Sequence, residues 1–156
     1  MPESAARPQV CLYMATERFD LVSWIIRRHT NCAWSHVGFF DTETRMTLSA
    51  ECDGKGIAWR PLKEDQTIIL LDAIGVDVAF ARMQAMIGTP YDFKKIVGIA
   101  LEMNLSTPGK EICDSSVFRC FEETGNPLVN PEFIPREHLT PRDILLSEKV
   151  TLREAV

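Results

Sequence analysis

Hydrophobic positions in the first half of the chain are grouped in short segments with two different periods. Residues 10–14 form an apolar run of strand length. Residues 19–28 carry apolar side chains at helical spacing, with basic residues at the end where a helix favours cations. Four short segments follow, divided by polar or glycine-containing turns, and they predict an antiparallel meander. These segments are residues 34–40, 47–52, 57–61 and 67–71.

Helical spacing returns in the second half of the chain. The predicted helices are residues 76–87, 92–103 and 113–124. The last of them ends before Gly125, in the position after a helix where glycine is favoured. Residues 126–156 contain four prolines, which predicts a loop with one short strand around 143–146. Helices that flank a small antiparallel sheet belong to the α+β class.

The length and composition predict one globular domain. A chain of 156 residues can bury a substantial core, and no repeat or linker divides it. We therefore expect a single domain over residues 1–156, with 1–8 flexible and 147–156 a C-terminal tail. The hydrophobic fraction of 46% and the charged fraction of 25% are ordinary for such a protein. The net charge of −5 argues against nucleic acid or an anionic membrane as the main partner.

The N-terminal sequence and the cysteines predict the cellular compartment of the protein. No apolar stretch of signal-peptide form begins the sequence, and the longest apolar runs are too short to span a bilayer. We therefore expect a cytoplasmic protein with no integral membrane segment. The five cysteines are an odd number without CxxC or metal-site spacing. This pattern predicts a reducing compartment and thiols that are mostly buried.

A carboxylate and a histidine are predicted to face each other across one hairpin. If the turn is centred between Glu43 and Thr44, antiparallel partners have position numbers that sum to 87, and His36 lies opposite Glu51. The carboxylate can then fix the tautomer of the imidazole and stabilise the imidazolium ion. A register shift of one residue would separate the pair. The alternative is a structural strand histidine and a solvated glutamate at the sheet edge.

Cys113 is the candidate nucleophile because it stands at the start of a predicted helix. The free amides and the positive end of a helix favour a thiolate, and the same amides can hold an oxyanion. The negative charge of Asp114 opposes the thiolate. The alternative is a buried thiol on the helix face that carries Val117, Cys120 and Phe121.

The other candidates have weaker contexts. Cys120 lies inside the helix and is assigned to the core, Cys52 is assigned a structural role, and Cys11 and Cys32 have no activating context. His29 and His138 are alternative bases without a carboxylate at a defined spacing. The three histidines have no metal-ligand spacing, and neither a phosphate-binding glycine loop nor a GxSxG motif is present. The sequence therefore predicts neither a metal nor a cofactor.

Four strings, in the order of the chain, resemble the motifs of the NlpC/P60 superfamily. They are Trp34-Ser35-His36-Val37-Gly38-Phe39, Ser49-Ala50-Glu51 with Gly56-Ile57, Gly88-Thr89-Pro90-Tyr91-Asp92-Phe93, and Ile112-Cys113-Asp114-Ser115-Ser116-Val117. Histidine precedes cysteine, the reverse of papain. This order resembles the circularly permuted branch, which includes the YiiX-like proteins and lecithin:retinol acyltransferase. The pair Asp114-Ser115 departs from the Cys-Ser followed by Glu or Gly that the family often shows.

The resemblance implies a fold and a set of site residues. The fold is a permuted papain-like one, with a small antiparallel sheet or half-barrel packed against three or so helices. In the implied site Cys113 is the nucleophile, His36 is the general base, and Glu51 orients His36. The residues that it implies for the substrate site are Tyr91, Trp34 and Ser35.

The implied activity is that of a papain-like cysteine peptidase, amidase or acyltransferase. Such an enzyme acts on an amide or ester through a thioester, here at Cys113. A cell-wall peptide and a lipid-linked amide or ester are both open as substrates. The alternative is a non-catalytic binding or assembly protein, of phage origin for example, that retains the fold.

Overall fold

The computed structural model describes residues 7–14, 21–130, 132–134 and 139–155, and in these it shows six strands and five helices. The strands are β1 (Gln9–Tyr13), β2 (His36–Asp41), β3 (Met46–Glu51), β4 (Gly56–Pro61), β5 (Ile68–Ala73) and β6 (Val150–Ala155). The helices are α1 (Leu21–Thr30), α2 (Val76–Gln84), α3 (Phe93–Leu101), α4 (Cys113–Glu123) and α5 (Pro141–Leu145).

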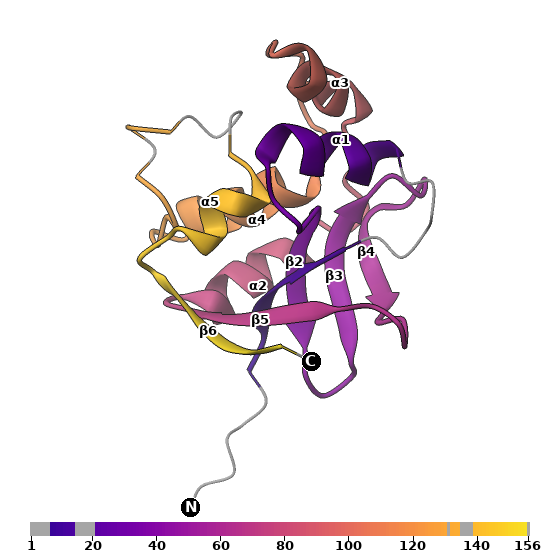
Figure 1. Ribbon diagram of the computed structural model, residues 1–156. Coiled ribbons are helices and arrows are strands. Elements are labelled where there is room, and N and C mark those ends of the chain that lie inside the picture. The colour runs from indigo at the N-terminus through magenta and orange to yellow at the C-terminus, as the bar shows by residue number, and fades with distance from the viewer. Residues whose placement is uncertain (1–6, 15–20, 131, 135–138, 156) are drawn as a thin grey trace, which may run out of the picture.

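One antiparallel sheet organises the molecule (Figure 1). Its strands lie in the order β4-β3-β2-β1-β5-β6, and each neighbouring pair is antiparallel. All five residues of β1 are buried, as expected for a strand in the middle of a covered sheet. The α+β class predicted from the sequence is confirmed.

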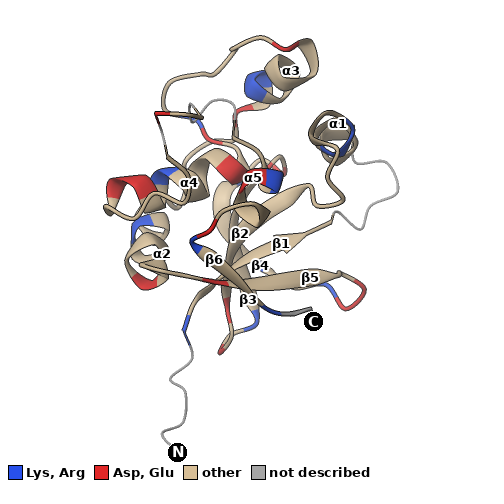
Figure 2. Cartoon of the chain, turned by 60° about the vertical axis from the view of Figure 1, so that its left-hand side comes forward, with Lys and Arg blue, Asp and Glu red and all other residues tan. Residues whose placement is uncertain are grey.

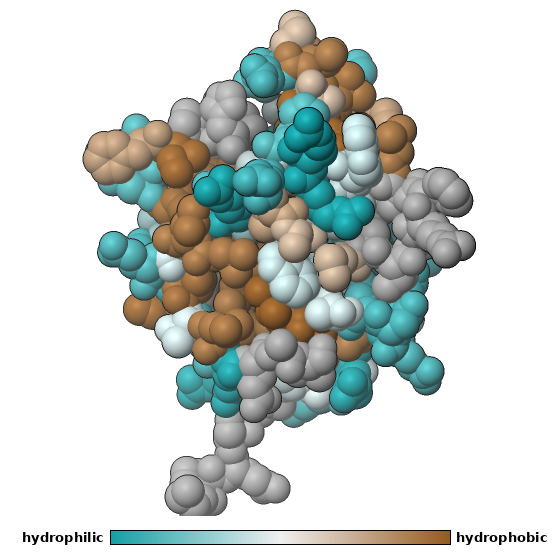
Figure 3. Space-filling view, in the orientation of Figure 1, coloured by the Kyte–Doolittle hydropathy of each residue, from teal (hydrophilic) through white to brown (hydrophobic). Residues whose placement is uncertain are grey.

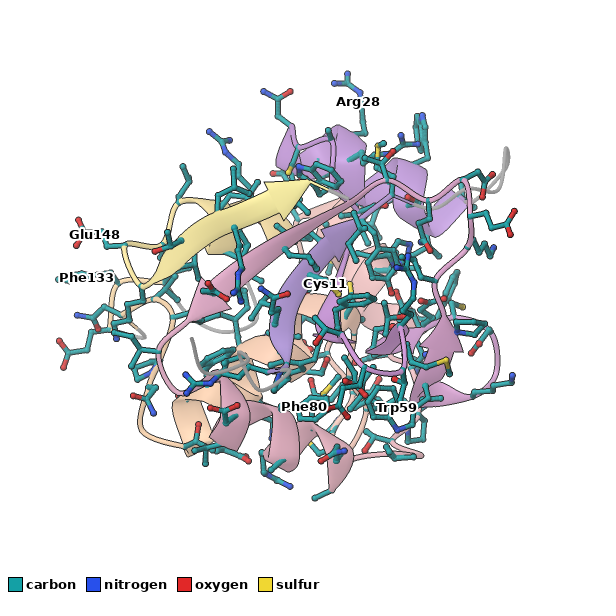
Figure 4. All side chains as sticks on the ribbon, turned by 90° about the horizontal axis from the view of Figure 1, so that it is seen from below. Cys11, Arg28, Trp59, Phe80, Phe133 and Glu148 are labelled. Carbon is teal, nitrogen blue, oxygen red and sulfur yellow. The ribbon has the colours of Figure 1, made fainter. Side chains whose placement is uncertain are left out.

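Alternate side chains of β1 enter two different cores. Val10 and Leu12 face the larger core, which lies between the sheet and the helices α2 and α4. Cys11 and Tyr13 face a smaller core on the opposite side. Figure 4 shows Cys11 on its strand in the middle of the molecule, whereas Arg28 points outward from α1. Burial of each large apolar side chain stabilises the fold by about 1.5–3 kcal/mol.

The larger core has an aromatic centre. Phe39 of β2 stacks on Phe121 of α4, with ring centroids 5.9 Å apart. Phe80 of α2 meets Phe39 and Trp59 edge to face, each at 5.8 Å. Figure 4 shows Phe80 and Trp59 side by side. These contacts attach both helices to the same face of the sheet.

A third, smaller cluster joins α1 and α3 to the start of α4. Its buried members are Val22, Ile26, Ile96 and Ile112. In Figure 1 α3 lies beyond α1 at the top of the molecule, away from the sheet. Tyr91 packs against both this cluster and the larger core, and therefore connects the pair of helices to the rest of the molecule.

The C-terminal segment corrects the sequence prediction. A helix, α5, occupies the position of the short strand predicted around 143–146, because Pro141 opens it and Asp143 caps it. An Asp143 carboxylate oxygen accepts hydrogen bonds from the backbone and hydroxyl of Thr140, at 2.8 and 2.7 Å. Residues 147–156, predicted as a tail, include the edge strand β6.

Two further expectations are wrong in detail. The meander ends at β4, because β5 pairs with β1 instead of with its predecessor. The described part of the chain also has five helices, where the spacing of apolar residues predicts four and the resemblance implies three or so. The other predicted helices and strands occur, each within a few residues of its predicted bounds.

The surface mixes charges and carries two apolar areas. Figure 2 shows basic and acidic residues side by side on α2 and α4, where Arg82 and Arg119 both pair with Glu123, at 2.6 and 2.7 Å. Figure 3 shows apolar atoms over α3 and over α5 with α2. The exposed apolar residues on these helices include Leu101, Leu145 and Val78.

None of the helices formed by the described residues has the length and apolar character that a membrane crossing requires.

Candidate active site

Cys113 is the first residue of α4, as the sequence predicts. The hydroxyl of Ser115 accepts a hydrogen bond from the backbone N–H of Ile112 at 3.2 Å and donates one to Glu111 at 2.6 Å. These bonds occupy part of the free hydrogen-bonding capacity at the start of the helix. The hydrogen bonds of Ser115 at the start of α4 therefore fix the backbone at Cys113.

The sulfur of Cys113 lies against the backbone that flanks His36. Its S–H donates to the carbonyl oxygen of Ser35 at 3.8 Å, and the sulfur accepts a hydrogen bond from the backbone N–H of Val37. Cys113 and Val37 both belong to the larger core. The fold thus brings the predicted nucleophile to the backbone at the beginning of β2, on the face of the sheet opposite to that of Tyr13, against which the ring of His36 stacks.

The thiol of Cys113 is inaccessible to solvent in this conformation. Cys113 is 0% exposed, and burial, followed by the charge of Asp114, raises the pKa of its thiol above the usual value. The amides of Val37 and Asp114 act in the opposite direction and are outweighed. The lowering expected from the helix end alone is therefore wrong for this conformation, because desolvation dominates.

His36 stacks on Tyr13, its pairing partner on β1. The ring centroids are 5.2 Å apart and the planes differ by 13°. His36 is buried, and its ring lies on the face of the sheet that carries Tyr13. The imidazole is therefore held flat against an aromatic ring at the first residue of β2.

The hairpin register predicted from the turn is confirmed. Phe39 pairs with Leu48 and Phe40 with Thr47, as position numbers that sum to 87 require. A side chain on Gly38 would meet the carbonyl oxygen of Leu48 at 2.7 Å, so only glycine lets the strands approach so closely here. The pairing covers residues 39–41 and 46–48 and does not extend to His36 and Glu51, which lie at the ends of β2 and β3.

Glu51 is connected to His36 through Tyr13. The Tyr13 hydroxyl donates to Glu51 at 2.6 Å, and it lies 2.7 Å from the hydroxyl of Ser49. Ser49 also donates to Glu51, at 3.1 Å. Arg60 is 3.4 Å from the other oxygen of Glu51. The carboxylate is thus fixed by three neighbours and contacts the phenol on which the imidazole rests.

Tyr13 was missed in the sequence because its role depends on a strand pairing between distant segments. Burial raises its pKa well above the usual value, and the nearby charge of Glu51 adds to the effect. The phenol therefore stays protonated and donates its hydrogen bond. The only local signal was the alternation of Cys11 and Tyr13 on one side of a predicted strand.

Tyr91, Trp34 and Ser35 all lie near this region. Tyr91 forms a parallel bridge with Glu111, two residues before Cys113, and its ring contacts the larger core. Trp34 is half-buried and also packs against that core. Ser35 is buried, and its hydroxyl accepts a hydrogen bond from Ser23 of α1. The three residues implied by the resemblance are therefore neighbours of the Cys113 segment.

Asp114 is the closest charge to the sulfur on its own helix. It is buried, and its carboxylate accepts a hydrogen bond from the N–H of Ser115 at 2.6 Å. Burial raises the pKa of Asp114 to about 6, and the positive charge of Lys95 limits the rise. The ionised carboxylate opposes a thiolate at Cys113, as expected from the sequence.

The remaining candidates lie elsewhere or are packed as core. His29 is exposed on α1, with a ring nitrogen 3.1 Å from the carbonyl oxygen of Ile25. His138 lies outside the described residues. Cys120 is buried with its sulfur 3.8 Å from those of Met83 and Met86, as predicted for a core residue.

The other thiols differ in exposure, and the five cysteines form no disulfide. Cys11 is buried, Cys32 is half-buried and Cys52 is exposed. Within the ranges described, no group of three or more His, Cys, Asp or Glu side chains is arranged to hold a metal ion.

No family model matches the chain, and a search of curated proteins finds no significant sequence match.

Proposed function

We propose that this protein is a cysteine hydrolase or acyltransferase of the permuted papain-like kind, with Cys113 as nucleophile and His36 as general base. The observation that carries the proposal is the contact of the Cys113 sulfur with the backbone on both sides of His36. A nucleophile at a helix start beside a strand histidine is the arrangement that such chemistry needs. Glu51 and Tyr13 support it as positioning residues for the imidazole.

The reaction divides into two steps. In the first, the Cys113 proton passes to His36 while the sulfur attacks the carbonyl carbon of an amide or ester. The collapsing intermediate expels the amine or alcohol, which takes the proton from His36 and leaves a thioester. In the second, His36 removes a proton from water or an acceptor, which attacks the thioester carbonyl. The C–S bond then breaks, the Cys113 sulfur takes the proton back from His36, and the acid or the new acyl product is released.

The raised pKa of the Cys113 thiol bears on how the nucleophile is activated. It favours removal of the proton by His36 during attack over a thiolate–imidazolium ion pair that already exists before substrate binds. A buried thiol with an elevated pKa holds its proton until a base removes it during attack. In the proposal, substrate binding releases the Cys113 sulfur from the Ser35 carbonyl and turns the His36 imidazole away from Tyr13, so that the two groups meet at the His36 end of β2. Amides at the start of α4 then stabilise the oxyanion.

The substrate carries an acyl group on nitrogen or oxygen. A cell-wall peptide and a lipid-linked amide or ester both meet this requirement. Half-buried Trp34 and Tyr91 offer aromatic surface for either. The choice between them is an outcome of the test below.

The decisive test uses two sets of electrophilic probes with the same thiol-reactive group. One set carries short peptides and the other carries long acyl chains, and the labelled residue is identified by mass spectrometry. Cys113→Ala should abolish labelling by the preferred set, and His36→Ala should slow it about 10²–10⁴-fold through loss of the general base.

Cys120→Ala is the matched control, since it removes a thiol from the same helix. It should leave labelling unchanged, because Cys120 packs against two methionines in the core. Equal labelling of the Cys113→Ala variant would exclude Cys113 as the nucleophile.

One observation favours the second candidate, a binding or assembly protein that retains this fold. Cys113 is fully buried and its pKa is raised, as in a structural thiol. In that case neither probe set would label Cys113 faster than the solvent-exposed Cys52.

A further inference from the structure

A cavity of about 300 Å³ lies between the end of α1, the helix α3 and the loop that follows α3. The loop turns back sharply, because the N–H of Met103 bonds to the carbonyl of Gly98 at 2.8 Å. A side chain at Gly98 would come within 2.5 Å of the Met103 carbonyl, so the return requires glycine. Apolar groups form much of the wall, namely Gly98, Ile99, Met103, Leu105 and Leu139.

Two buried polar side chains also line this cavity. Thr30, the last residue of α1, is 8% exposed, and its hydroxyl oxygen has no hydrogen-bond partner among the described residues. A buried hydroxyl without a partner is rare in a native protein and points to a missing acceptor. A helical threonine could bond to its own backbone, but Thr30 does not.

Lys95 of α3 is the second of these side chains. It is 7% exposed, which is unusual for lysine, and it lines both this cavity and a neighbouring one that carries Asp92 and Glu111. Its charge acts on the buried carboxyl group of Asp114 and lowers the pKa of that group. A buried cation normally has a paired anion, because desolvation of an isolated charge is costly. Lys95 therefore offers an ammonium group to whatever occupies the space that it lines.

We propose that this cavity binds a small monocarboxylate with an apolar body. The Lys95 ammonium and the Thr30 hydroxyl are two donors, and a carboxylate has two oxygens to accept from them. The apolar wall formed by Ile99, Leu105 and Leu139 suits a short hydrocarbon group. A volume of about 300 Å³ is at the lower end for ligand pockets, which limits the ligand to a small molecule.

The charge at the rim argues for one negative charge and not two. Glu102 also lines the cavity, and its carboxylate disfavours a dianion such as a phosphate monoester. A phosphate site is usually built from several backbone amides or from arginine, whereas Lys95 is the one Lys or Arg among the described residues of this lining. A singly charged carboxylate fits both observations.

Calorimetric titration of the wild-type protein with hexanoate tests the proposal. Hexanol, which has the same hydrocarbon chain without the charge, and acetate, which lacks the chain, should each bind far more weakly. Lys95→Met keeps the length of the side chain and removes the charge. It should weaken hexanoate binding by about 10- to 100-fold, as expected for a lost charged hydrogen bond.

Two further variants complete the design. Thr30→Val removes only the hydroxyl and should weaken binding by about three- to tenfold. Lys94→Met is the matched control, because Lys94 is the exposed neighbour on the same helix and does not line the cavity. It should bind hexanoate as the wild type does.

The readout is binding alone and does not depend on the chemistry proposed for Cys113. Absence of saturable hexanoate binding to the wild type would overturn the proposal, as would equal affinity for hexanol. An equal loss in Lys94→Met would show attraction by surface charge instead of a site. If Lys95→Met does not fold, the affinity of Thr30→Val for hexanoate and the comparison of hexanoate with hexanol still decide whether the cavity binds a carboxylate.

Discussion

At the scale of single residues, the acid–base chemistry of this protein is governed by burial. Cys113 and Tyr13 are nearly inaccessible, and in both the loss of water raises the pKa more than neighbouring donors lower it. Asp114 adds a negative charge beside the sulfur. The helix end that favours a thiolate therefore competes with a local environment that favours the thiol.

Asp114 should make stability depend on pH. Its pKa is about 6 in the folded state against 3.8 as the ordinary value, so between these values the folded state binds the proton more tightly. Stability contributed by the protonated acid is therefore present below about pH 4 and is lost as the pH rises toward about 6.

Asp114→Asn should remove this loss of folding stability at rising pH. The variant should be more stable than the wild type at pH 7 by up to about 3 kcal/mol, from a shift of 3.8 to about 6 at roughly 1.4 kcal/mol per unit. Near pH 4 the two should be equal. Urea unfolding at both pH values measures the difference, and a variant less stable at pH 7 would contradict it.

At the scale of elements, the loop before Tyr91 is attached to the edge strand β4. The N–H of Ile57 bonds to the carbonyl of Thr89 at 2.9 Å, and the N–H of Gly88 bonds to the carbonyl of Ile57 at 2.9 Å. These bonds occupy backbone groups on an edge that would otherwise be open. They also determine where Tyr91 enters the region around Cys113.

Gly56 makes this attachment possible. It has a φ of 65°, and a side chain there would come within 2.0 Å of the Thr89 carbonyl. Gly56→Ala should therefore lower the free energy of unfolding by about 3 kcal/mol or more, since strain and overpacking add.

Gly54→Ala is the matched control in the same turn. Gly54 has a φ of 84° and open space around it, so alanine should lower the free energy of unfolding by only about 1–2 kcal/mol from the backbone conformation. Thermal and urea unfolding of both variants give the comparison. Equal losses would mean that the contact with Thr89 contributes nothing.

At the scale of the whole molecule, the apolar contacts are divided unequally. The core between the sheet and the helices α2 and α4 contains most of the buried apolar residues, whereas α1 and α3 are joined by a cluster of four. A unit with few buried contacts can open without global unfolding. The pair α1 and α3 is therefore expected to be the least stable part of the described fold.

Hydrogen exchange should reveal this difference. Amides of α1 and α3 should exchange at least about tenfold faster than those of α4, a helix of similar length in the larger core. Ile96→Ala should accelerate exchange in α1 and α3 and leave β1 unchanged. Uniform exchange across all three helices would contradict a separate opening unit.

Local sequence patterns determined most of the elements and part of the site. Period-two and helical spacing predicted five of the six strands and four of the five helices, because side-chain periodicity reflects which face is buried. The turn between Glu43 and Thr44 also determined the register of the hairpin, since a short turn leaves one pairing. The start of α4 at Cys113 could also be predicted from the local pattern of side chains.

Only the tertiary structure decided how these parts meet. Tyr13 reaches His36 and Glu51 through the pairing of β1 with β2, and β6 returns to β5 from the far end of the chain. The burial that raises the Cys113 pKa, and the cavity that contains Lys95, are properties of packed helices. Such contacts join residues distant in sequence, and their energies depend on solvent exclusion, which no local pattern records.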